Sequence, residues 1–227
     1  MIGTDQRSTK VVKNVENYVI TIARGFGSGG KQIGKLLASQ LGIPCYESQI
    51  SQMASECSGI SQEKFMQTDE RLRRPSLLRL IRKAPDIDRA YAPSDRKFVS
   101  DDNLFRIQAW IIRELAKSKP CIIVGKCANH ILRDRANVLS VYVEAPRKTC
   151  VESIMQKSGV TAEQANKLIV KTDQYRAEYY KYYTGGDDWT NPTLYDLTVN
   201  TGRLSREDAA RLIIQAARIK FGEDALY

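Results

Sequence analysis

The sequence is poor in the residues that build zinc centres and disulfide frameworks. It contains one histidine, and none of its cysteines stands in a C-x-x-C pair. A zinc site therefore has too few ligands at a suitable spacing. Scattered, odd-numbered cysteines on apolar or strand-like segments are typical of reduced core thiols in a cytoplasmic protein. The five cysteines are Cys45, Cys57, Cys121, Cys127 and Cys150.

The chain also lacks a long apolar run. No stretch approaches the roughly 18 apolar residues that are needed to cross a bilayer. Residues 1–17 alternate polar and charged side chains, unlike a secretory signal. We therefore expect a soluble, cytoplasmic protein with no membrane partner. The 42% hydrophobic and 27% charged shares of its 227 residues are close to globular averages.

The charge of the chain is basic, at +9 from 35 basic and 26 acidic side chains. Such an excess favours an anionic partner, and both a nucleotide and a nucleic acid qualify. Many basic residues, Arg71 among them, lie in the proline-broken segment 70–100. We interpret residues 1–17 as a tail and residues 18–227 as a single domain. Segment 70–100 is then an insertion that we expect over the edge of the sheet.

Short apolar runs alternate with longer amphipathic segments along the chain. Segments such as 31–41 and 104–117 place their apolar side chains on one helical face, and Thr161 and Ser205 are expected to cap two further helices. Strands that alternate with helices and are apolar throughout predict a parallel sheet covered on both faces. The predicted strands are residues 18–23, 43–46, 121–124, 139–143 and 195–199.

A glycine-rich loop joins the first predicted strand to the following helix, and Gly25-x-x-x-x-Gly30-Lys31 has the spacing of a P-loop. Glycines let backbone N–H groups surround phosphate oxygens, where a side chain would block the approach. The positive end of the helix points at the same anion, and Lys31 reaches for the β- and γ-phosphates. The predicted phosphate-binding residues are Gly25, Gly27, Ser28, Gly29, Gly30, Lys31 and Gln32.

The last position of this motif is unusual. A P-loop commonly ends in Ser or Thr, whose hydroxyl binds Mg²⁺, but here Gln32 follows the lysine. An amide oxygen can also ligate magnesium, directly or through water, so Gln32 is a weak metal candidate. The alternative to a phosphate site is a glycine-rich turn without a ligand. The buried strand before the loop and the amphipathic helix after it favour the phosphate site.

Segments spread along the chain resemble the cytidylate kinase-like family of P-loop nucleoside monophosphate kinases, and they occur in the same order. The resemblance extends from about residue 18 to the C-terminus. It implies a three-layer α/β/α P-loop kinase fold with a five-stranded parallel sheet, a helical acceptor flap at about residues 47–100, and a lid at about residues 160–190. The segments are ITIARGFGSGGKQIG (20–34), IIVGKCANHIL (122–132), DQYRAEYY (173–180) and YDLTVNT (195–201).

The resemblance also implies an activity, namely transfer of the γ-phosphoryl group of MgATP to CMP or a related small phosphorylated acceptor. Arg176 lies three residues after Asp173, so the two share a helical face. An arginine in the lid of such a kinase stabilises charge on the transferring group, whereas the alternative for Arg176 is a surface ion pair. The candidate catalytic residues are Lys31, Asp173 and Arg176, and the candidate acceptor-binding residues are Arg24, Arg71 and Lys126.

The chain departs from the family pattern at the end of its third predicted strand. Relatives tend to have Gly-Arg there, but this chain has Gly125-Lys126, and Asn129 replaces a frequent aspartate. Lysine keeps the charge and loses the bidentate geometry of arginine. Together with Gln32, these changes leave two interpretations: an active kinase, or a regulatory nucleotide-binding protein. A nucleic-acid-binding module is disfavoured, because the basic residues gather where an acceptor phosphate would bind. The oligomeric state stays open.

Overall fold

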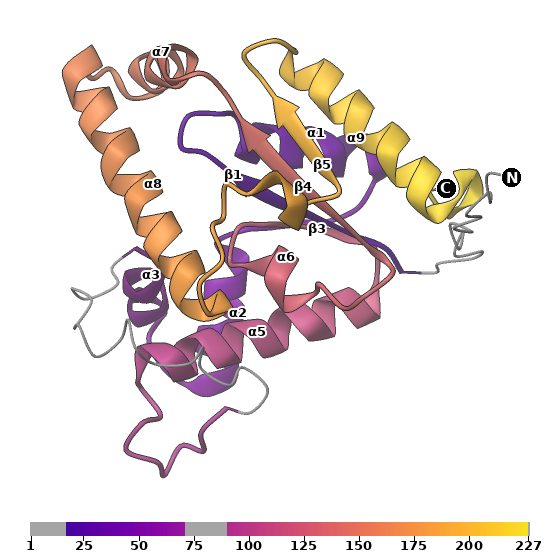
Figure 1. The fold of residues 1–227 in the computed structure, drawn as a ribbon. Coiled ribbons are helices and arrows are strands. Elements are labelled where there is room, and N and C mark those ends of the chain that lie inside the picture. Colours follow the sequence, from indigo (N-terminus) through magenta and orange to yellow (C-terminus); the bar gives the residue numbers. More distant parts are fainter. Residues whose placement is uncertain (1–16, 71–89, 227) are drawn as a thin grey trace, which may run out of the picture.

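The computed structural model describes residues 17–70 and 90–226. Within that part, all strands belong to one five-stranded sheet with the order β2-β3-β1-β4-β5, and every neighbouring pair is parallel. The carboxyl ends of the strands therefore lie at one edge of the sheet (Figure 1). The strands are β1 (Val19–Arg24), β2 (Cys45–Tyr46), β3 (Cys121–Val124), β4 (Val138–Glu144) and β5 (Leu197–Asn200).

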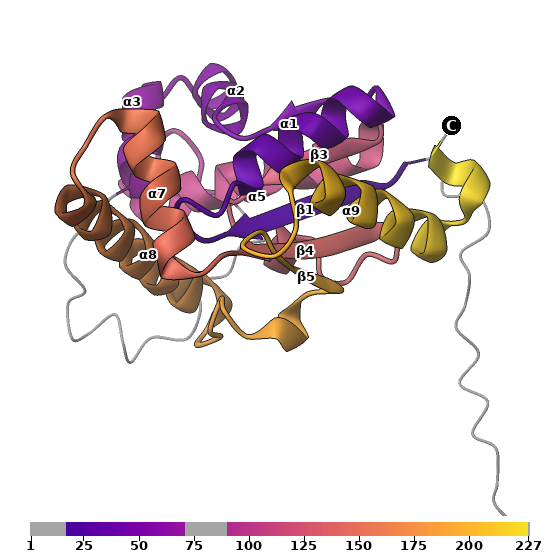
Figure 2. The same cartoon turned by 90° about the horizontal axis from the view of Figure 1, so that it is seen from above.

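Helices cover both faces of the sheet, which gives the expected three-layer α/β/α fold (Figure 2). The helices are α1 (Gly30–Leu41), α2 (Gln49–Ser58), α3 (Gln62–Glu70), α5 (Asp101–Ser118), α6 (Ala128–Ile131), α7 (Arg147–Ser158), α8 (Ala162–Thr184) and α9 (Arg206–Phe221). Helices α1 and α9 contact each other and one face, while α5 and α6 contact the other. Helices α7 and α8 pair beside the carboxyl ends of the strands (Figure 1). No described helix is both long and apolar enough to cross a membrane.

Two hydrophobic cores result from the alternation of side chains along each strand. In β1, Ile20 and Ile22 pack with Leu37 on the side of α1 and α9. Val19 points to the opposite core, which holds Phe105 of α5. Burial on both faces explains why β3 is apolar throughout, whereas the edge strand β5 alternates with the exposed polar residues Thr198 and Asn200.

The strands occur where the apolar runs predict them, with ends that shift by one or two residues. The second strand is shorter than expected and begins at Cys45. The preceding residue, Pro44, accepts a hydrogen bond from the backbone N–H of Ile122. Proline has no N–H group to donate, so the hydrogen-bonded ladder of the strand starts one residue later. Thr161 and Ser205 cap α8 and α9 as predicted, and Thr161 forms a complete capping box with Gln164.

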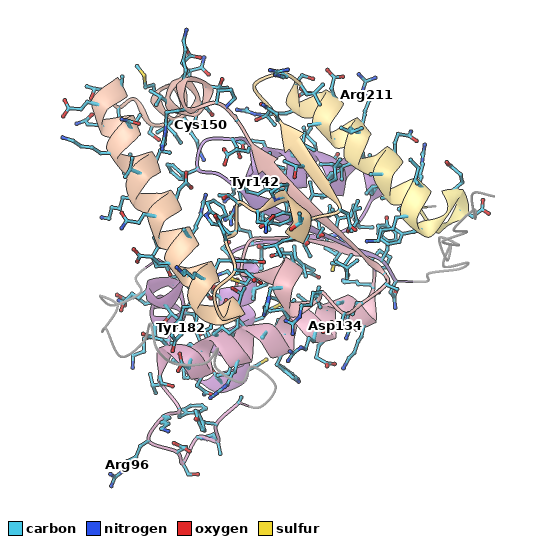
Figure 3. The ribbon with its side chains drawn as sticks, in the orientation of Figure 1. Arg96, Asp134, Tyr142, Cys150, Tyr182 and Arg211 are labelled. Atoms are coloured by element: carbon cyan, nitrogen blue, oxygen red, sulfur yellow. The ribbon has the colours of Figure 1, made fainter. Side chains whose placement is uncertain are left out.

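Two expectations need correction. Cys121, Cys127 and Cys150 are buried thiols, but Cys57 is exposed on α2, so the cysteines are not all in the core. The described end of the basic segment, residues 90–100, lies beside α5 and not over the sheet edge: the N–H of Tyr91 donates to Asn103. Arg96 projects from the tip of this loop (Figure 3). Arg71 and the rest of the segment to residue 89 lie outside the described residues.

Leu37 fixes α1, and with it the glycine loop, to the sheet, since its side chain is fully buried in the core beneath α9. We expect Leu37→Ala to lower the free energy of unfolding by about 2–5 kcal/mol through lost burial and a residual cavity. Urea denaturation measures the change. Gln40→Ala, at an exposed position of the same helix, is the control and should stay within about 0.5 kcal/mol of the parent.

Candidate functional site

The glycine loop between β1 and α1 is folded so tightly that no side chain fits at several of its glycines. Gly27 has a φ of +93°, and a Cβ added there would lie 2.8 Å from the carbonyl oxygen of Cys150. A Cβ on Gly30 would lie 2.6 Å from the Cβ of Arg24. Both approaches are closer than side-chain atoms tolerate, so glycine is required at Gly30, where the P-loop pattern places it, and also at Gly27.

The N-terminus of α1 is left open to an anion. Gly29 occupies the N-cap position without a side-chain cap, and the first turn contains no acidic residue. Its N–H groups and the positive end of the helix are therefore available to phosphate oxygens, as an ATP phosphate chain requires. The hydroxyl of Ser28, a predicted phosphate-binding residue, donates to the carbonyl of Gly25 at 2.9 Å and braces the loop.

Lys31 lies in the first turn of α1 and pairs with a carboxylate that the sequence did not predict as part of the site. Its Nζ lies 2.5 Å from Oε2 of Glu47, the residue that follows β2. Oε1 of Glu47 also accepts a hydrogen bond from Nη2 of Arg24 at 3.3 Å. Burial would raise the pKa of Glu47, but hydrogen bonds and charges from Lys31 and Arg24 outweigh it and lower that pKa. Glu47 is therefore ionised and bridges the two cations.

Gln32 lies half-buried in the first turn of α1, near the open helix end. In the described part of the chain, no group of three His, Cys, Asp or Glu side chains could hold a metal ion. The described residues therefore fit Mg²⁺ only as the ion often binds beside nucleotides, where waters and substrate phosphates supply most of its ligands. Gln32 is the side chain from the predicted set that would supply an amide oxygen.

Arg24 and Lys126 meet at the end of β3 through an unusual backbone turn. Gly125, Lys126 and Cys127 all have positive φ, and the guanidinium of Arg24 lies where a Cβ of Gly125 would be. Left-handed backbone at two consecutive non-glycine residues is strained and is most often found at functional sites. The turn directs Nζ of Lys126 to the hydroxyl of Ser51 at 2.8 Å.

Burial lowers the pKa values of three cations in this region. Burial, followed by the charge of Arg24, lowers the pKa of Lys126 to about 7. Burial and Arg24 likewise lower the pKa of Arg176 to about 10, against the opposing effect of Asp173. Burial also lowers the pKa of Arg24, which Glu47 partly offsets. A bound anion would relieve these repulsions, so the electrostatics favour a phosphate here.

Asp173 and Arg176 connect α8 to the glycine loop. Oδ1 of Asp173 accepts hydrogen bonds from the backbone N–H of Phe26 at 2.9 Å and from Nη1 of Arg176 at 3.2 Å. The same Nη1 donates to the carbonyl of Arg24 at 2.9 Å. The alternative interpretation was an ion pair on the exposed surface. These residues do not form one, since both side chains are largely buried against the loop.

A cavity of about 840 Å³ lies between the carboxyl ends of β1 and β3, helices α2 and α3, and α8. Apolar and aromatic residues form much of its wall, including Phe26, Met66, Leu168, Tyr175, Tyr179 and Trp189. Its charged lining, in the described residues, consists of Arg24, Lys126, Lys171, Arg176 and Glu47. The structure thus brings together the predicted Arg24, Lys126 and Arg176, with Lys31 next to them through Glu47. Arg71 is not described.

Asn129 and the tyrosines of α8 form the side of the cavity. The amide of Asn129 donates to the hydroxyl of Tyr180 at 2.9 Å and so connects α6 with α8. Tyr175, Tyr179 and Tyr183 form one stripe, and the ring of Tyr183 stacks on Phe105 of α5. The stripe packs α8 against its neighbours, as the spacing suggests, and the rings of Tyr175 and Tyr179 also line the cavity.

Comparison with known proteins agrees with this geometry. Residues 19–203 match the cytidylate kinase-like family. The chain belongs to that family. Relatives named cytidylate kinase include one from Pyrococcus horikoshii, 24% identical over 87% of this chain and 87% of the relative. Another, from Aeropyrum pernix, is 28% identical over 85% of this chain and 94% of the relative.

Solved structures share the fold of this family member. An uncharacterized protein from Eubacterium ventriosum superposes with a TM-score of 0.65 at 23% identity, covering 88% of this chain and 98% of that chain. A protein from Thermus thermophilus reaches 0.50 at 16% identity, over 89% and 98%. At these identities the likeness supports the three-layer α/β/α fold and says nothing of the substrate.

The near-neutral pKa of Lys126 predicts pH-dependent anion binding. Lys126 is charged below about pH 7 and neutral above it, so the affinity for sulfate, which does not titrate in this range, should fall several-fold between about pH 6 and pH 8.5. Isothermal titration calorimetry measures the affinity. Lys126→Arg keeps its charge throughout and should show a flatter profile. Identical profiles for the two proteins would contradict a titrating Lys126.

Proposed function

We propose that the protein transfers the γ-phosphoryl group of ATP to a nucleoside monophosphate, with CMP or a related small phosphorylated compound as acceptor. The observation that carries this proposal is the cavity that adjoins the glycine loop, because Arg24, Lys126 and Arg176 line it together. Relatives named cytidylate kinase that align with most of the chain support the same activity. Free cysteines and a nucleotide substrate favour the cytoplasm as the place of reaction.

The donor phosphates are bound by the open N-terminus of α1, with Lys31 at the β- and γ-phosphates. The acceptor enters the cavity, and Arg24 and Lys126 hold its phosphate at the ends of β1 and β3. Arg176 reaches from α8 to the same edge, where it can follow the charge of the transferring group. Mg²⁺, for which Gln32 is the candidate side-chain ligand, would neutralise part of the charge of the donor phosphates.

No general base is needed for this reaction. The attacking oxygen of an acceptor phosphate is already ionised at neutral pH, so phosphoryl transfer depends on positioning and on charge stabilisation. The apolar wall from α8 excludes water from the reacting groups, which limits hydrolysis of ATP. The aromatic residues Tyr175 and Tyr179 offer faces against which a nucleobase can stack.

One observation favours the second interpretation, a regulatory nucleotide-binding protein. Lys31, the lysine of the P-loop, is engaged by Glu47 at 2.5 Å instead of pointing into an empty phosphate cradle. If that pair persists with ATP bound, the lysine cannot follow the transferring phosphoryl group. Binding without transfer would then be the activity of the protein.

A panel assay separates the two interpretations. ATP consumption is measured with Mg²⁺ and each of CMP, dCMP, UMP, AMP and GMP, and we expect transfer to at least one pyrimidine nucleotide. Lys31→Ala should abolish turnover, because it removes the cation at the β- and γ-phosphates. Lys35→Ala, at an exposed position on the same helix, is the control and should leave turnover unchanged. ATP binding with no transfer to any acceptor would favour the regulatory interpretation.

Arg176→Lys tests the proposed arginine of the lid. Lysine keeps the charge but lacks the planar guanidinium, which contacts Asp173 and the carbonyl of Arg24 through Nη1 and keeps its other N–H groups for phosphate oxygens, so kcat should fall at least about 100-fold. Arg211→Lys is the matched control, because Arg211 forms the same i,i+3 pair with Asp208 on the exposed face of α9 (Figure 3). Equal, small effects of the two changes would contradict a catalytic role for Arg176.

A further inference from the structure

Glu47 joins three elements that the phosphate site requires. Its carboxylate lies 2.5 Å from Nζ of Lys31 in the first turn of α1 and 3.3 Å from Nη2 of Arg24 at the end of β1. Glu47 itself follows β2, two strands away from β1. Its side chain is 22% exposed and that of Arg24 is 20% exposed, so this ion pair is partly shielded from water and interacts more strongly than a pair on the open surface. The Lys31 side chain is 50% exposed, so water screens its pair with Glu47 more.

The surroundings of Glu47 are strongly cationic. Among the charged residues that line the cavity in the described part of the chain, Glu47 is the one carboxylate. Two other acidic side chains near the loop, Asp173 and Glu144, have hydrogen-bond partners of their own. Glu47 therefore carries the charge that allows Lys31 and Arg24 to lie close to each other before any phosphate arrives.

The two partners of Glu47 belong to different halves of the proposed site. Lys31 lies on the loop that binds the donor phosphates, whereas Arg24 lines the cavity that receives the acceptor. A carboxylate that contacts both sets the separation and direction of the two cations. It also occupies the position between them that the phosphoryl oxygens must approach, so it competes with those oxygens for the same cations.

We propose that Glu47 is a positioning residue: it orients Lys31 and Arg24 for transfer and acts as the internal counter-ion that incoming phosphates displace. This inference rests on the proposed kinase function for its effect on turnover, whereas its effect on anion binding is independent of that function. Glu47 is a poor general base, because Lys31 and Arg24 lower the pKa of its carboxyl despite burial and so disfavour its protonation.

Removing the charge of Glu47 therefore has opposite effects on binding and on turnover. In Glu47→Gln the competing carboxylate is gone, so affinity for inorganic pyrophosphate should rise roughly three-fold or more. The same change releases Lys31 and Arg24 from their orientation, so kcat should fall at least about 10-fold. Glu47→Asp keeps the charge on a shorter side chain and should recover part of kcat.

Glu56→Gln provides the matched control. Glu56 lies on the neighbouring helix α2, is exposed, and accepts a hydrogen bond from Gln52. Glu56→Gln removes the same charge at a site without a contact to Lys31 or Arg24. Pyrophosphate affinity, kcat and KM should therefore all stay at parent values. Thermal unfolding of each variant shows whether a loss of activity comes from a loss of folded protein.

The binding arm uses calorimetry with pyrophosphate, and the kinetic arm measures kcat and KM for ATP and the acceptor. Tighter pyrophosphate binding with lower kcat in Glu47→Gln supports the proposal. Weaker pyrophosphate binding in a folded variant overturns it, and so does an unchanged kcat in an active kinase. If the parent transfers no phosphoryl group to any acceptor, the kinase function fails, and the pyrophosphate arm alone then decides whether Glu47 is the counter-ion.

Discussion

The close approach of backbone segments around the glycine loop is the constraint on which the rest of the site depends. Where β1 ends and α1 begins, the chain lies so near to Arg24 and to Cys150 of α7 that only glycine fits at Gly30 and Gly27. The first turn of α1 therefore has no side-chain cap and no acidic residue, and it points to the carboxyl edge of the sheet. Helix α8 then closes one side of that edge through its contact with the N–H of Phe26.

This arrangement concentrates positive charge at the site, which is energetically unfavourable in the free protein. Burial disfavours the charged forms of Arg24, Lys126 and Arg176, and their mutual repulsion lowers the pKa values of Lys126 and Arg176 further. Glu47 and Asp173 offset part of that cost through ion pairs and hydrogen bonds. A polyphosphate supplies the remaining negative charge, so the site is electrostatically prepared for a ligand of that class.

Local sequence patterns predicted the fold and the glycine loop, because spacing and periodicity are properties of neighbouring residues. Glu47 was missed because its importance depends on the strand order β2-β3-β1, which brings the residue after β2 near Arg24 and Lys31. The brace formed by Ser28 and the left-handed turn at Lys126 also depend on tertiary contacts that no local pattern encodes. The shorter second strand, by contrast, could have been predicted from Pro44.

We propose that donor and acceptor phosphates meet between the glycine loop and the cavity lined by Arg24, Lys126 and Arg176. The most direct test of this proposal is the affinity of a bisubstrate compound in which adenosine and cytidine are joined by five phosphates. The account predicts that calorimetry finds this compound bound at least about 100-fold more tightly than ATP, because both halves of the site are filled at once. An affinity equal to that of ATP would contradict it.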